Sequence, residues 1–268
     1  MSVIVYDHPL SPYGQKVKIA LAEKGVEFET RMPEAIGSGA TAGEFAEASP
    51  RGEVPALVDG DGIRIFDSTI ILEYIEDRWP DPPLLPASPV ARARARMLED
   101  VMDTHFEAIT WGLSELRNFG RGEGELADGM FDRGLSQIQQ WYRWLEGQLS
   151  TADWFNGDSF GWADLCVAPF VNGAVGFGAE PADALADWLA RANARPSVTA
   201  CRDAAAAVAL GSAAVSLEAV RAAMEQGLFK REYRDHRLEW MVKTGGLAIV
   251  ADGIASNNIR FIDPFAAA

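Results

Sequence analysis

Two serines near the N-terminus stand where a small anion could be held. Ser11 precedes Pro12, a residue typical of the first helical position, and Ser68 follows Asp67 at the start of a second helical pattern. A helix N-terminus offers unpaired backbone N–H groups and a partial positive charge, and a serine hydroxyl adds a donor. Both positions therefore suit a thiolate or a carboxylate, although each is also compatible with a simple helix cap.

The elements that must position these serines alternate between strand and helix. Residues 2–6 form a β-branched run that predicts a buried strand, and the helix begun by Ser11 should end at Gly25. Residues 26–32 alternate apolar and charged side chains, as an edge strand does. A hairpin is expected over 56–66 and a helix from Ser68 to the first proline of the next segment. The predicted order is βαβ followed by ββα, with residues 33–50 unassigned.

A proline-rich stretch from Trp79 to Pro89 divides the chain, because neither a helix nor a central strand accepts so many prolines. The first part is mixed α/β, and the remainder is nearly all helical. The predicted division is an α/β domain at 1–79, a linker at 80–89, an all-helical domain at 90–210 and a C-terminal extension at 211–268.

Helical periodicity recurs through the second part. One helix should begin after Gly161, with Asp164 at its third position, where a carboxylate favours the positive helix end. The final residues, 245–268, have a mixed pattern and are expected along the surface. The other expected helices cover 91–116, 130–149, 182–194, 198–210, 216–225 and 228–243.

Composition narrows the function classes. The chain has 268 residues and a formal net charge of −15, so nucleic acid and anionic membranes are not expected partners. Two cysteines, Cys166 and Cys201, are too few for a disulfide framework or a zinc site, and no metal is expected. No secretion signal or run of about 18 apolar residues is found, which predicts a cytoplasmic protein.

Four segments in order resemble the cytosolic glutathione S-transferases: residues 10–25 (LSPYGQKVKIALAEKG), 49–57 (SPRGEVPAL), 67–75 (DSTIILEYI) and 160–164 (FGWAD). The resemblance covers residues 1–210 and is to bacterial, serine-type members. It implies a thioredoxin-like N-terminal domain, an all-helical C-terminal domain, glutathione as co-substrate and a homodimer. Gly161 departs from the family pattern, which has Ser or Thr at that position.

The resemblance implies that Ser11 donates a hydrogen bond to the glutathione thiolate. Lowering a thiol pKa from about 8.5 by about two units takes roughly 2.7 kcal/mol, which a charged hydrogen bond and a helix terminus supply together. Tyr6 and Tyr13 stay alternatives for this role, although the pattern around Tyr6 favours a packed strand residue. The absence of cysteine before Leu57 argues against the cysteine-type branch.

The remaining glutathione contacts also follow from the resemblance. Ser68 would hold the γ-glutamyl carboxylate and Asp67 would orient the amine. A cis peptide before Pro55 would expose the Val54 backbone to the cysteinyl group. Arg51 and Lys16 are candidate partners for the glycyl carboxylate, although each also suits a solvated charge.

The co-substrate is expected to be a small hydrophobic electrophile in an apolar pocket between the domains. Tyr13, His105 and Trp111 are the predicted substrate contacts, and His236 is expected on a solvated face. The leading function is glutathione transfer. The long tail resembles that of glutathione-dependent etherases, so an etherase, dehalogenase or isomerase of aromatic catabolism is an alternative, as is a non-catalytic binding protein of the same fold.

Overall fold

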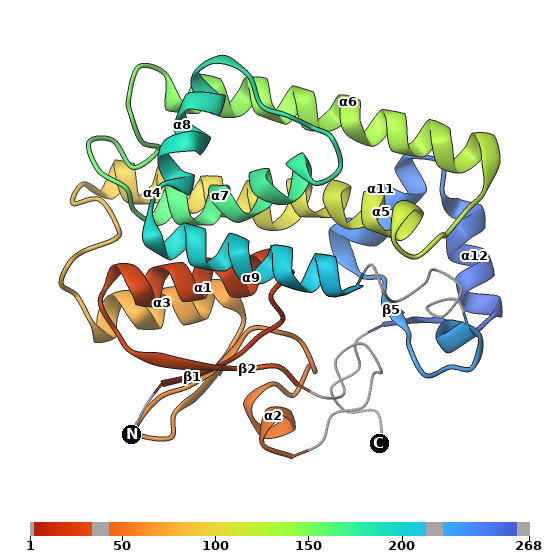
Figure 1. Cartoon of the computed structure of the whole chain (residues 1–268), viewed down its shortest axis with the longest axis horizontal. Helices are drawn as coiled ribbons and strands as arrows, with labels where there is room; N and C mark the ends of the chain where they lie inside the picture. Colours follow the sequence, from red (N-terminus) through yellow and green to blue (C-terminus); the bar gives the residue numbers. More distant parts are fainter. Residues whose placement is uncertain (1–2, 34–42, 213–221, 262–268) are drawn as a thin grey trace.

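The computed structural model describes residues 3–33, 43–212 and 222–261 (Figure 1). A small sheet with helices on both faces lies beneath a larger set of helices, and the C-terminal elements lie at one end of that set. The expected class, a thioredoxin-like α/β part followed by an all-helical part, is confirmed. The residue limits given above for the domains stay a prediction.

The sheet has four strands in the order β2-β1-β3-β4. β1 (Val3–Tyr6) pairs in parallel with β2 (Phe28–Arg31) and antiparallel with β3 (Ala56–Val58), and β3 pairs antiparallel with β4 (Arg64–Phe66). The parallel pair requires a crossover, which α1 (Pro12–Glu23) provides. Both the βαβ unit and the hairpin are therefore confirmed.

Helices cover the two faces of this sheet unequally. α1 and α3 (Ser68–Arg78) pack together on the face turned toward the helical part, where α7 (Trp162–Val175) and α9 (Pro196–Ser212) also contact α1 (Figure 1). The opposite face carries the short helix α2 (Gly43–Ala48). α2 falls within the stretch that the sequence left unassigned, and residues 34–42 of that stretch lie outside the described residues.

The helical part begins with one long rod in three pieces: α4 (Pro89–Val101), a π-helical segment η1 (Met102–Phe106) and α5 (Glu107–Arg117). A single α-helix was expected over 91–116. The π turns change which side chains share a face, and such turns are frequent at functional sites. The remaining helices of this part are α6 (Gly124–Leu149), α7 (Trp162–Val175), α8 (Asp183–Asn193) and α9 (Pro196–Ser212).

Gly161 begins α7 as predicted, and the structure explains why it is glycine. A Cβ at this position would lie 2.4 Å from the Leu84 carbonyl oxygen and 2.1 Å from Nδ2 of Asn156. The Asp164 carboxylate accepts a hydrogen bond from the Gly161 N–H (3.2 Å) in place of a side-chain cap. Close backbone approach, which only glycine permits, therefore takes precedence over the better cap.

The extension differs from its prediction. Residues 228–243 were expected to be one helix, but β5 (Arg231–Glu232) precedes α11 (Asp235–Lys243). β5 pairs in parallel with β6 (Ile259–Arg260), which follows α12 (Leu247–Ala255). Most of the helix expected over 216–225 lies outside the described residues.

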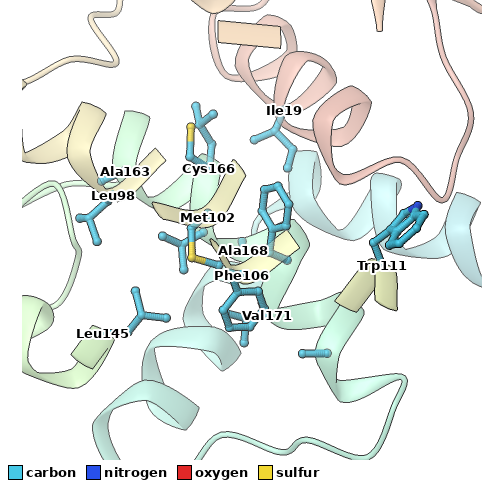
Figure 2. Close-up of a cluster of buried hydrophobic side chains, with 14 of the residues drawn as sticks. Ile19, Leu98, Met102, Phe106, Trp111, Leu145, Ala163, Cys166, Ala168 and Val171 are labelled. Carbon is cyan, nitrogen blue, oxygen red and sulfur yellow. The ribbon is translucent and has the colours of Figure 1, made fainter. Parts of the chain in front are cut away.

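A continuous apolar core joins the rod to α1, α6 and α7 (Figure 2). Phe106, Met102 and Cys166 are fully buried in it. Burial raises the pKa of the Cys166 thiol, so the thiolate is disfavoured there. In the described part of the chain, no helix combines the length and the apolarity that crossing a bilayer requires.

Candidate active site

A cleft of about 1170 Å³ lies between the α/β part, the rod and the extension. From the α/β part it is lined by the start of α1, the loop before β3 and the start of α3. The helical part contributes η1, α5, α7 and α9, and the extension contributes residues 229–232, 234–237 and 260. The cleft therefore brings together Ser11, Val54, Pro55, Asp67, Ser68, Tyr13 and Trp111 from the predicted site.

Ser11 is the N-cap of α1. Its Oγ accepts a hydrogen bond from the Gly14 N–H at 3.2 Å, and its backbone is extended (φ −77°, ψ 113°). Among the described residues, no acceptor for the Ser11 hydroxyl proton is found, so the O–H can donate to a group in the cleft. The cap and the free donor coexist because a hydroxyl both accepts and donates.

The Val54–Pro55 peptide bond is cis, as the resemblance implied. Both residues line the cleft and come immediately before β3 in the chain. Ser49 holds the loop in shape, because its Oγ donates to the Glu53 carbonyl at 2.8 Å and accepts from the Glu53 N–H at 3.2 Å. These two hydrogen bonds fix the backbone just before Val54, which lines the cleft.

Asp67 is the N-cap of α3 and adopts the left-handed φ of 77°. Its Oδ1 accepts from the Thr69 N–H at 3.1 Å, while its Oδ2 pairs with Nη2 of Arg51 at 3.1 Å. Ser68 is buried at the first position of the helix. A cation-binding carboxylate and an anion-binding helix N-terminus are thus adjacent, which suits an amino acid with both charges.

The two tyrosines are already engaged elsewhere. Tyr6 donates to Oε2 of Glu44 at 3.2 Å and does not line the cleft. Tyr13 lines it but donates to the Asp103 carbonyl at 2.6 Å, and desolvation raises its pKa well above the usual range. Ser11 therefore fits the thiolate donor better than either rival does.

Two other residues suggested by the sequence do not line the cleft. His105 is not among its lining residues; it is exposed and stacks on Trp141 with ring centroids 5.6 Å apart. Lys16 is fully buried and pairs with Glu99 at 2.7 Å and with Asp103, so it is not a solvated charge or a glycyl-carboxylate ligand in this structure. Trp111, in contrast, lies in the wall, edge-to-face with Tyr233.

The extension supplies a charged wall that the sequence did not indicate. Nη2 of Arg234 pairs with Oε1 of Glu53 at 2.9 Å, directly beside the Val54 loop. Arg237 pairs with Glu107 on the rod at 2.6 Å. His236, expected on a solvated face, is half-buried and lines the cleft.

Glu53 lies where the extension meets the α/β part. Burial and the nearby Glu232 carboxylate raise the pKa of Glu53 to about 7, against the lowering effects of Arg234 and Arg51. Arg51 is a local partner at 2.7 Å, but no motif near residue 53 indicates Arg234 and Glu232, because both are far away in the sequence.

Comparison with known proteins agrees with this geometry. Residues 10–78 match the family model for the glutathione S-transferase N-terminal domain, and residues 128–191 match the model for the C-terminal domain. A maleylacetoacetate isomerase from Mus musculus is 32% identical over 177 residues, which are 65% of this chain and 79% of that protein. The chain belongs to the glutathione S-transferase family.

Relatives with a different name have comparable sequence identity. A stringent starvation protein A homolog from Haemophilus ducreyi is 31% identical over 159 residues, covering 59% of this chain and 68% of that protein. Homologs of the same name from Coxiella burnetii and Pasteurella multocida are matched over only 47% and 39% of their own lengths.

Solved structures of the family share the fold. A glutathione S-transferase from Rhodospirillum rubrum superposes with a TM-score of 0.66 at 28% identity, over 74% of this chain and 91% of that one. A glutathione S-transferase from Methylobacterium radiotolerans, in complex with glutathione sulfonate, gives 0.62 at 27% identity over 75% and 94%. Residues 222–261, which build the charged wall, lie outside both family models.

Proposed function

We propose that this protein is a glutathione transferase in which the Ser11 hydroxyl stabilises the glutathione thiolate. The observation that carries the proposal is the Ser11 O–H, which lines the cleft at the start of α1 and has no acceptor among the described residues. Attack of the thiolate on an electrophilic carbon forms a C–S bond. Either a leaving group departs or the adjacent carbon of an activated double bond takes a proton from water.

The two energetic contributions at Ser11 suffice for this role. A hydrogen bond to a charged acceptor contributes about 1.5–3 kcal/mol, and the positive end of a helix adds about 0.3–1 kcal/mol. Their sum corresponds to a thiol pKa lowered by about one to three units. The bound thiol would then be substantially ionised at neutral pH.

The rest of glutathione fits the same wall. Asp67 faces the cleft with a carboxylate for the γ-glutamyl amine, and the α3 N-terminus at Ser68 offers N–H groups for its carboxylate. The backbone beside the cis Val54–Pro55 bond is available to the cysteinyl backbone. The relative with bound glutathione sulfonate supports glutathione as the co-substrate.

We also propose a homodimer formed through α3 and α4. These helices are adjacent, since Arg96 of α4 pairs with Glu73 of α3 at 2.6 Å. Ile70, Val90 and Met97 expose 56%, 68% and 43% of their surfaces on them, which gives both helices apolar side chains for such a contact. Light scattering of the purified protein tests this, and a monomeric mass contradicts it.

The first experiment follows the ultraviolet absorbance of the thiolate in the glutathione-saturated protein against pH. We expect a thiol pKa well below about 8.5 in the wild type. In Ser11→Ala it should rise by about one to two units, with kcat/KM toward an activated aryl halide falling about 10- to 150-fold.

Ser88→Ala is the matched control. Ser88 caps α4 before Pro89 just as Ser11 caps α1 before Pro12, with its Oγ accepting from the Ala91 N–H at 3.1 Å, but it lies outside the cleft. It should lose comparable stability and no activity. Tight binding of glutathione with an unshifted thiol pKa would instead favour the non-catalytic binding protein.

Isomerisation is the second candidate, because the maleylacetoacetate isomerases are among the similar relatives. The mass of the product separates the two reactions. A transferase yields a conjugate with the summed mass of electrophile and glutathione, less the mass of HX where a leaving group X is displaced. An isomerase returns glutathione and a product of unchanged mass.

A further inference from the structure

Basic side chains are concentrated in the cleft of an otherwise acidic protein. Eight of the chain's 24 lysines and arginines line it, beside six carboxylates, although the whole chain carries a net charge of −15. A cation that is already paired with a carboxylate is less available to a ligand, so the cations without a partner are the candidates for ligand binding.

Most of them are. Five of the eight form ion pairs with carboxylates: Arg51, Arg231, Arg234, Arg237 and Arg260. Arg117 donates to the Gly176 carbonyl at 3.3 Å, and Lys230 donates to Oδ1 of Asn257 at 3.0 Å. Within residues 3–33, 43–212 and 222–261, Arg202 is the one cleft cation with neither an ion pair nor a hydrogen bond.

Arg202 lines the same cleft as Ser11, and its side chain is exposed there. It is on α9 immediately after Cys201, whose Sγ is 3.9 Å from the Gln15 carbonyl in the first turn of α1. Gln15 in turn donates its N–H to the Ser11 carbonyl at 3.0 Å. The helix that carries Arg202 therefore packs on the first turn of α1, and both helices border the cleft.

Small and aromatic side chains line the cleft together with Arg202. Ala205 and Ala206, three and four positions later, lie on the same helix face and also line the cleft, and both are small. Tyr13 and Phe170 also line the cleft, where they meet edge-to-face with centroids 5.6 Å apart and supply an aromatic surface. An apolar surface with one unengaged cation fits a ligand with a planar body and an acidic group.

We infer that Arg202 is a specificity-determining residue that binds an anionic group of the electrophile, so that the co-substrate is an aromatic acid rather than a neutral hydrophobic compound. This inference rests on the proposed function, because it places the acid beside a glutathione thiolate. It also gives Arg202 a role that packing alone would not require.

The test compares 4-chloro-3,5-dinitrobenzoate with its methyl ester. In both, the thiolate forms a C–S bond to the chlorinated ring carbon, the C–Cl bond breaks, chloride leaves and the thiol proton passes to water. Dividing each kcat/KM by the uncatalysed rate removes the difference in intrinsic reactivity. The wild type should favour the acid.

Arg202→Gln should lower the corrected kcat/KM for the acid at least about tenfold, chiefly through KM, and leave the ester within about twofold. Arg202→Lys, which keeps the charge, should restore part of the loss. Arg143→Gln is the matched control, because Arg143 is exposed on α6, outside the cleft and without a described partner. An equal loss for acid and ester, or no loss for either, would overturn the inference.

A binding measurement keeps the inference testable if no conjugation is found. Quenching of tryptophan fluorescence by 3,5-dinitrobenzoate and by its methyl ester gives both affinities without glutathione. Weaker binding of the acid alone in Arg202→Gln supports the role of Arg202 even if the thiol pKa shows that glutathione is not activated. Unchanged affinity for the acid contradicts it.

Discussion

The cleft has an N-terminal wall, which contains Ser11 and Asp67, and an extension wall, which contains Arg237. The two walls differ in the contacts that hold their side chains in place. In the N-terminal wall, Ser11 bonds to a backbone N–H three residues later and Asp67 to one two residues later. In the extension wall, Arg237 bonds to Glu107, 130 residues away, and Tyr233 to Glu115, 118 residues away. One wall is organised by local backbone geometry and the other by long-range ion pairs.

This difference indicates which wall tolerates change. A helix cap forms wherever its helix forms, so it survives changes elsewhere in the chain. A buried ion pair requires both partners in place, and removing one leaves an uncompensated charge. We therefore expect the extension wall to depend on single residues more strongly than the N-terminal wall does.

The largest effect is expected at Glu115, the anchor of the extension. Its carboxylate is fully buried and pairs with Arg121 at 3.0 Å and with Arg231, while Tyr233 donates to it at 2.8 Å. Glu115→Ala should lower the free energy of unfolding by about 3–5 kcal/mol, because two arginines lose their buried partner.

Urea denaturation measures this loss, and Glu115→Gln should cost less because it can still accept a hydrogen bond from Tyr233. Limited proteolysis should cut the extension of the Ala variant first. A loss under about 1 kcal/mol would mean that apolar packing, rather than ion pairing, holds the extension wall.

An intermediate effect is expected at Glu53, where the two walls meet. Its pKa of about 7 lies above the ordinary 4.5, so the fold favours the protonated form. The associated stability is fully present below about pH 4.5 and is lost as the pH rises through about 7. Glu53→Gln lacks this titration.

Between about pH 5 and pH 8, the wild type should therefore lose about 1–3 kcal/mol more stability than Glu53→Gln. Urea midpoints at the two pH values provide the measurement. Glu47→Gln, in the exposed pair with Arg64, should follow the wild type. If the stability of the wild type and of Glu53→Gln changed equally with pH, burial of the Glu53 carboxylate would not destabilise the contact between the two walls.

The smallest effect is expected in the N-terminal wall. Asp67→Ala removes the α3 cap and should cost about 0.5–2 kcal/mol, while Asp67→Asn keeps a side-chain oxygen and tolerates the positive φ. Both variants should weaken glutathione binding, because both lose the carboxylate. If Asp67→Ala destabilised the protein more than Glu115→Ala, the contrast between the walls would be wrong.

The sequence was informative where the signal was local. Ser-Pro and Asp-Ser pairs mark helix starts by residue chemistry alone, and the predicted positions of Ser11, Asp67 and Ser68 in the cleft agree with the structure. The cis bond before Pro55 was implied by a motif around it. The orientation of His105 could not be predicted in this way. His105 lies in η1, and the π turns there change which side chains share a face of the helix.

What the sequence by itself determined is therefore the fold class and the short-range part of the site: helix starts, a proline turn and their order along the chain. Only the tertiary structure decided that Lys16 is buried between two carboxylates, that Gly161 must be glycine because of Leu84, and that the extension faces the cleft. The physical reason is range. Capping and turn preferences act within a few residues, whereas burial and ion pairing depend on which distant residues the completed fold brings into contact.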